Sequence, residues 1–96
     1  MRSVYLVCYD ISDPKRLRKV FKAMRGFGDH LQYSVFRCDL SPRERAEMVT
    51  VVDAIIDHLA DQVLIVDLGP PDGRASECFF ALGRPYTAPE RLAVIV

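Results

Sequence analysis

Asp10 is the residue whose type and position best suit chemistry, because it directly follows an apolar run that ends in Tyr9. Mg²⁺ prefers oxygen ligands and is often held by one or two carboxylates plus water molecules. Such an ion at Asp10 could orient a phosphodiester and activate water. The alternative is a turn residue, since Asp often bonds its own backbone in loops, and Asp13 is expected to cap a helix. Residue type alone leaves both interpretations open.

One carboxylate per chain makes a weak metal site. If a two-fold axis brought two copies of Asp10 together, a single ion could lie between them, and the dimer would be the catalytic unit. The chain has 96 residues, half of them apolar, which is enough for one core. Small domains bury a smaller share of their surface than large ones, which also favours a dimer.

A basic cluster follows Asp10. Between Pro14 and Arg25 there are six basic residues and no acidic one, although the whole chain has no net charge. A neutral protein can still carry one basic face, and such a face would bind phosphates without regard to sequence and in a salt-sensitive manner. A simply solvated helix face is the alternative. The cluster consists of Lys15, Arg16, Arg18, Lys19, Lys22 and Arg25.

Other reactive side chains give weaker signals. Tyr9 and Phe36 could stack a base if they were exposed, but their apolar neighbours favour core packing. His30 and His58 have no second ligand at zinc-site spacing. The three cysteines match neither an even disulfide set nor a metal motif, so we expect buried, reduced thiols. They are Cys8, Cys38 and Cys78.

Two helices and several strands must position these residues. The run from Ser3 to Asp10 predicts a central strand buried on both faces. Asp13 as cap and Pro14 at the first position predict a helix whose buried residues recur at helical spacing. A second helix is expected to open at Ser41 with a capping box. The expected buried positions are Leu17, Val20, Phe21 and Met24 in the first helix, and Val49, Val52, Ile55, Ile56 and Leu59 in the second.

The remaining apolar runs predict further strands. The segment from His30 to Leu40 reads as one strand or two kinked halves, and Gln62 to Leu68 as another. Glu77 to Leu82 and Leu92 to Val96 are the last two candidates. Two helices on one face of a mainly antiparallel sheet make an α+β, ferredoxin-like sandwich of βαββαβ type.

The C-terminal strand is expected to be an extra one, exchanged between two copies of the chain. We therefore divide the sequence into a ferredoxin-like domain at 1–83 and a linker with a dimer-exchanged strand at 84–96, within a single domain overall. No run approaches the roughly 20 apolar residues that span a bilayer, and the N-terminus lacks the layout of a signal peptide. We expect a cytoplasmic protein without a membrane partner.

The chain resembles the small CRISPR-associated protein family numbered second in that system, described as an endoribonuclease or spacer-integration subunit. The resemblance covers nearly the whole chain. It depends on the order and spacing of 9–13 (YDISD), 15–20 (KRLRKV) and 31–36 (LQYSVF), with the later runs 64–68 (LIVDL) and 93–96 (AVIV).

The resemblance implies a homodimer with a Mg²⁺ or Mn²⁺ site at its axis, formed by Asp10 as catalytic and metal-binding residue. It also implies phosphate contacts by Arg16 and Arg18, for which Lys15 and Lys19 are further candidates. Tyr9, Ser34 and Phe36 fall at positions that shape the site. Leu17 interrupts a basic run that is often continuous in relatives.

Two functions follow from this resemblance. One is a metal-dependent endonuclease acting on RNA or DNA in antiviral defence, within a complex of two integrase dimers and one dimer of this chain that acquires new spacers. The other is a non-catalytic scaffold that holds duplex DNA in that complex. The aspartate is expected in either case. A third reading, independent of the family, is a small-ligand sensor or an oligomerisation module, against which the acid-free basic helix argues.

Overall fold

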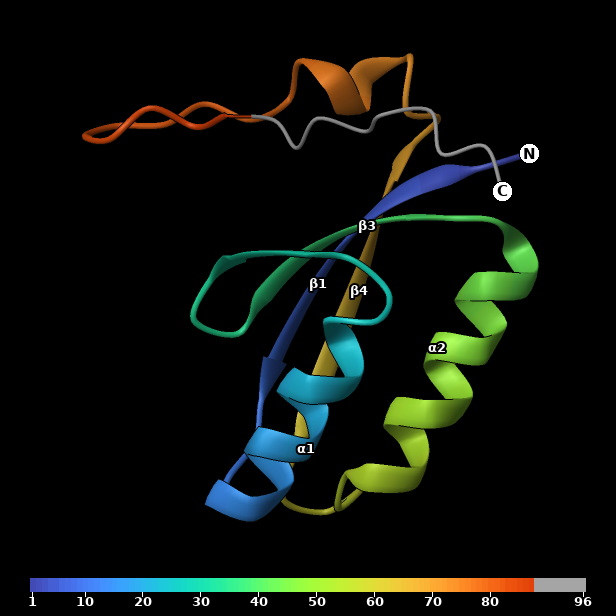
Figure 1. Ribbon diagram of the computed structural model, residues 1–96, viewed down its shortest axis with the longest axis vertical. Coiled ribbons are helices and arrows are strands. Elements are labelled where there is room, and N and C mark those ends of the chain that lie inside the picture. Colours follow the sequence, from blue (N-terminus) through green and yellow to red (C-terminus); the bar gives the residue numbers. More distant parts are fainter. Residues whose placement is uncertain (88–96) are drawn as a thin grey trace.

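Four antiparallel strands form one sheet in the order β2-β3-β1-β4 in the computed structural model, which describes residues 1–87. Two helices cover one face of this sheet (Figure 1). The βαββαβ order and the central position of β1 confirm the predicted ferredoxin-like α+β fold. The bounds are β1 Ser3–Asp10, α1 Pro14–Met24, β2 Asp29–Gln32, β3 Val35–Leu40, α2 Pro42–Ile55 and β4 Gln62–Gly69.

Both helices begin where the sequence predicts. The Asp13 side chain accepts a hydrogen bond from the Arg16 amide at 2.9 Å, and Pro14 takes the first position of α1. At α2, the Ser41 amide donates to Glu44 Oε1 at 2.8 Å and the Glu44 amide donates to Ser41 Oγ at 3.1 Å. This reciprocal pair is the expected capping box.

The core lies between the helices and the face of β1 that carries Tyr5, Val7 and Tyr9. Alternate residues of a strand point to opposite faces, so these three side chains share one side. The helices contribute Val20, Met24, Met48 and Val52 to this core, and β3 contributes Phe36, Cys38 and Leu40.

Three helix positions differ from the prediction. Leu17 in α1 was expected in the core but is 37% exposed. Leu59 is fully exposed because α2 ends at Ile55, four residues earlier than its apolar spacing suggested. Val49 is 38% exposed, while Met48 beside it is buried. Met48 was not among the predicted core residues. The buried face of α2 therefore contains Met48 where the prediction placed Val49.

The face of the sheet away from the helices, called here the open face, is apolar but poorly covered. On β1 it carries Leu6 and Cys8, which are half-buried. Their partners on β4 are Val66 and Leu64, which are 44% and 53% exposed. The prediction that the first strand is buried on both faces is therefore confirmed on this face at Val4, which is fully buried, and wrong at Leu6 and Cys8 in a single chain.

The segment predicted as one strand or two kinked halves is a hairpin of β2 and β3. Its turn contains Tyr33, whose φ of 25° is a left-handed backbone conformation, and whose side chain is 94% exposed. The turn interrupts the alternation read from the sequence, because Val35 pairs with Gln32 across a register shift.

The chain after β4 departs most from the prediction. A short 3₁₀ helix spans Arg74–Ser76, and 77–82 contains no strand. Phe80 and Leu82 are 88% and 86% exposed, and Cys78 is exposed rather than buried. The predicted strand at 92–96 lies outside the described residues. Within residues 1–87, neither α-helix is long and apolar enough to cross a membrane.

Candidate nucleic-acid and metal site

Asp10 is the last residue of β1 and its side chain is exposed. By strand alternation it lies on the open face, in line with Leu6 and Cys8. Its partner across the sheet is Gln62, the first residue of β4. The carboxylate thus stands at the polar end of an otherwise apolar strip of sheet.

The donor set around Asp10 fits a shared ion better than a complete site in one chain. Among the described residues, no three His, Cys, Asp or Glu side chains are grouped closely enough to hold a metal. One exposed carboxylate can still supply one ligand of a Mg²⁺ ion, because that ion keeps several water molecules as its other ligands. The arrangement fits the group only if a second carboxylate comes from another copy.

The three predicted site-shaping residues lie together, on the opposite face from Asp10. The rings of Tyr9 and Phe36 stack with their centroids 6.2 Å apart, and both side chains are buried. The Tyr9 amide donates to the Ser34 carbonyl oxygen at 3.1 Å. Burial raises the pKa of the Tyr9 phenol, and a hydrogen bond with the Ser34 side chain partly opposes this. The two rings are therefore core residues, as their neighbours indicated.

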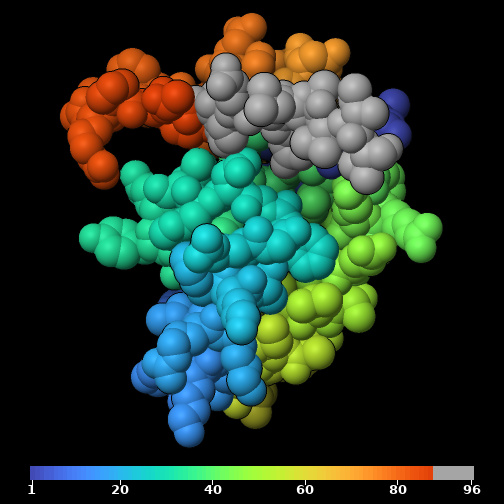
Figure 2. Space-filling view, in the orientation of Figure 1, coloured from blue at the N-terminus to red at the C-terminus, as the bar shows by residue number. Residues whose placement is uncertain are grey.

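The basic residues of α1 divide into two groups. Lys15, Arg18 and Lys19 are exposed. They belong to α1, which begins beside the end of β1 (Figure 1) and whose surface is open in the space-filling view (Figure 2). Arg16 is only 28% exposed, and its Nε donates to Asp61 Oδ2 at 2.8 Å. The predicted set thus contains three cations open to a polyanion and one that is engaged by a carboxylate.

Asp61 is a residue that the sequence reasoning missed. Its side chain is fully covered and accepts hydrogen bonds from both Ser12 and Arg16. The sequence signal for Asp61 was its position directly before the run 62–68. In an antiparallel pair the first residue of one strand lies beside the last residue of the other, as Gln62 lies beside Asp10.

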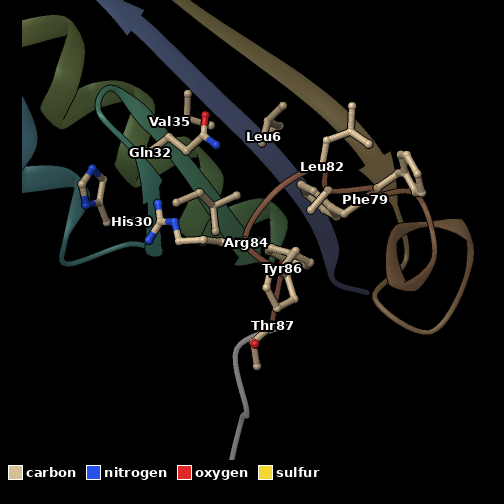
Figure 3. A pocket seen from close by; sticks show the side chains of 13 residues that line it. Leu6, His30, Gln32, Val35, Phe79, Leu82, Arg84, Tyr86 and Thr87 are labelled. Atoms are coloured by element: carbon tan, nitrogen blue, oxygen red, sulfur yellow. The ribbon is translucent and has the colours of Figure 1, made fainter.

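A cavity of about 600 Å³ lies between the segment from Phe79 to Thr87 and the sheet (Figure 3). Leu6 and Val35 line it from the open face, and Phe79, Leu82 and Tyr86 line it from the segment. Its size shows that this segment does not pack tightly on the sheet of its own chain.

The chain is similar to proteins of one known family. A family model described as "CRISPR associated protein Cas2" matches residues 2–73. The CRISPR-associated endoribonuclease Cas2 1 of Rhodospirillum rubrum is 42% identical over 92 residues, covering 96% of this chain and 89% of the relative. The CRISPR-associated endoribonuclease Cas2 of Geobacter sulfurreducens is 40% identical over 96 residues, and the match covers both chains completely.

A solved structure agrees with the sequence relatives. The crystal structure of Streptococcus pyogenes Cas2 at pH 6.5 has a TM-score of 0.74 and 32% sequence identity, covering 83% of this chain and 99% of that chain.

Proposed function

The chain belongs to the CRISPR-associated Cas2 family, and from that premise we propose that it is a metal-dependent endonuclease of RNA or DNA that works as a homodimer around two copies of Asp10. The observation that carries this proposal is the position of Asp10. It is an exposed carboxylate at the end of a half-covered apolar sheet face, where a second copy would pack. Relatives named as endoribonucleases support the reaction class.

The open face supplies the reason for a dimer. Leu64 and Val66 are exposed there, and Phe80 and Leu82 project from the following segment with more than four-fifths of their surface exposed. Burying such apolar area yields roughly 25 cal/mol per Å². A second copy seated on this face would cover these side chains and, with the two-fold axis near the Gln62 end, bring the two Asp10 carboxylates together.

Each part of the chain then has a role. Asp10 from both copies would hold Mg²⁺ or Mn²⁺, and Lys15, Arg18 and Lys19 would bind the phosphate backbone. The ion, when bound, supplies positive charge for the scissile phosphate and lowers the pKa of a bound water molecule. The core packing of Tyr9 and Phe36 fixes the end of β1, so that Asp10 emerges in one direction.

The test is cleavage of labelled single-stranded RNA and duplex DNA, with Mg²⁺ and with chelator. Asp10→Ala is expected to abolish cleavage while light scattering still reports a dimer. Asp72→Asn is the matched control, because Asp72 is an exposed carboxylate that follows β4 at the opposite end of the sheet. Cleavage that survives in Asp10→Ala or persists in chelator would refute metal-dependent catalysis at Asp10.

The place of the chain in spacer acquisition is the second part of the proposal. We expect the dimer to join two integrase dimers, through 84–96, and to hold a protospacer duplex on the basic faces of α1. The purified integrase of the same CRISPR locus should integrate labelled duplex into a repeat only when this chain is present. If Asp10→Ala supports integration fully but the chain never cuts nucleic acid, the scaffold function is the correct one.

A further inference from the structure

Among residues 1–87, Asp61 has the most hydrogen-bonded side chain outside the proposed site. Its Oδ1 accepts from the Ser12 amide at 2.9 Å, from Ser12 Oγ at 3.1 Å and from Arg16 Nη2 at 3.2 Å. Its Oδ2 accepts from Arg16 Nε and from the Asp57 amide, both at 2.8 Å. Every partner is a donor, so the carboxylate suits these contacts only while it is ionised.

These contacts join three segments that meet next to Asp10. Ser12 belongs to the loop after β1, Arg16 to the first turns of α1, and Asp57 to the loop before β4. Asp61 itself precedes Gln62, which pairs with Asp10. One covered carboxylate therefore fixes the start of α1 and the start of β4 relative to the end of β1.

The short loop after Asp10 is held at each of its residues. The Ile11 side chain is buried in the core, Ser12 donates twice to Asp61, and Asp13 caps α1. The Asp10 side chain is exposed, and its backbone is held by the pairing with Gln62 on one side and by these loop residues on the other. Loss of the Asp61 contacts would release Ser12, two residues from the proposed metal ligand.

The same contacts decide the role of Arg16. Its guanidinium donates through two nitrogens to Asp61, and Nη2 also donates to Ser12 Oγ at 3.2 Å. The Arg16 hydrogen bond is the largest cause that holds the pKa of Asp61 far below its usual range, with the amides of Asp57 and Ser12 acting in the same direction. A phosphate contact by Arg16 would have to break a two-point charged pair.

We propose that Asp61 is a positioning residue for Asp10, acting through Ser12 and Arg16. The hydrogen-bonded cluster of Asp61, Ser12 and Arg16 is called here the clamp. Arg16 belongs to this clamp and makes no phosphate contact. The first half of this inference rests on the proposed function. The second half concerns binding alone and can be tested without cleavage.

The salt dependence of binding tests the role of Arg16. Each phosphate contact to a single strand adds about 0.7 to the slope of log affinity against log salt. We expect Arg18→Ala to lower this slope for a labelled single-stranded RNA by about 0.7, and Arg16→Ala to leave it unchanged. An equal loss of slope in both variants would overturn the assignment, because Arg16 would then contact phosphate.

The role of Asp61 is tested with Asp61→Asn, which keeps the shape of the side chain and removes its charge. Misplacement of a catalytic group by about 1 Å can cost about 100-fold in rate, so we expect kcat for RNA cleavage to fall about 10- to 100-fold. The KM for RNA should stay within about twofold of the native value, because the exposed cations of α1 are unchanged. A KM effect without a kcat effect would refute the positioning role.

A spectroscopic readout separates this inference from the nuclease proposal. Mg²⁺ titration followed by the amide resonances of Asp10 and Ile11 should show weaker binding in Asp61→Asn, and amide exchange at Ser12 should be faster. Ser12→Ala, which removes only a hydroxyl from an exposed residue, should show smaller changes in the same directions even if Asp61→Asn fails to fold. If no form cleaves RNA but these shifts occur, the nuclease proposal fails and the clamp stands; unchanged metal binding and exchange would overturn the clamp.

Discussion

A β-carbon on Gly28 would lie 2.5 Å from the Sγ atom of Cys38 and equally close to the Arg37 carbonyl oxygen. Gly28 follows α1, where the chain passes closely over β3. The carbonyl is part of the backbone and cannot rotate away, so any side chain at this position must displace a strand.

Gly28→Ala is therefore expected to lower the free energy of unfolding by about 1–3 kcal/mol, the usual cost of overpacking. Urea unfolding followed by circular dichroism measures this. Gly26→Ala is the matched control, because its nearest neighbour, the Ala23 carbonyl oxygen, would lie 3.3 Å from the added carbon. Equal stability of the two variants would show that the close approach is not as described.

Phe36 and Tyr33 are two aromatic residues whose replacement is expected to affect stability very differently. Phe36 is fully buried and Tyr33 is 94% exposed. Phe36→Ala should cost about 3–5 kcal/mol of stability through lost burial and a cavity, whereas Tyr33→Ala should change it by less than about 0.5 kcal/mol. Thermal and urea unfolding of both variants check this. A large effect at Tyr33 would mean that the hairpin turn packs against something in solution.

Much of the fold was predictable because local signals agreed with long-range packing. Asp13 with Pro14 and Ser41 with Glu44 mark both helix starts, since capping depends on residues a few positions apart. The turn at Tyr33 gave no Gly or Pro signal, so the hairpin could not be separated from one strand. The segment 77–82 has the composition of a strand but no partner strand among the described residues.

The candidate site was predictable only in part. Asp10 and the exposed cations of α1 can be found from residue type and order. The contacts of Asp61 cannot, because Arg16 and Ser12 lie 45 and 49 positions from it in the chain. The place of Asp61 directly before a strand indicates only that it lies near the end of β1, without naming its partners.

The exposed cations of α1 should dominate nucleic-acid affinity. A Lys15→Ala/Lys19→Ala double variant is expected to lower the salt slope for single-stranded RNA by about 1.4, for two lost phosphate contacts. Arg43→Ala is the control. Arg43 lies on α2, away from the basic helix α1, and although it is 90% exposed, it pairs with Glu47 of the same helix at 3.4 Å. Filter binding across a salt series measures both. A comparable loss in the control would indicate a diffuse charge effect with no defined binding face.

Stability should fall in acid partly through Glu44. Its pKa is lowered, first by the hydrogen bond from the Ser41 amide and also by the charge of Arg2, which lies 2.9 Å away. A carboxyl with a depressed folded pKa stabilises the fold above its unfolded pKa, about 4.3 for Glu. That contribution is lost as pH falls through the folded value.

Urea unfolding between pH 7 and pH 3 should therefore show native protein and Glu44→Gln converging as pH falls below about 4.3. At pH 7 the native protein should be the more stable of the two. A gap between them that stays constant down to pH 3 would contradict the role given to the ionised carboxylate.

Two exposed valines on opposite sides of the molecule provide the sharpest test of the proposed dimer. Val66 lies on the open face of β4 and is 44% exposed, and Val51 lies on α2 and is 40% exposed. Val66→Lys would place a charge in the apolar interface without a partner, which is costly on burial, so light scattering should report a monomer. Val51→Lys should remain a dimer. Because each monomer would then carry a single Asp10, Val66→Lys should also lose metal-dependent cleavage while keeping its salt-sensitive affinity for RNA through α1; a monomer that still cleaves would place the whole catalytic site in one chain.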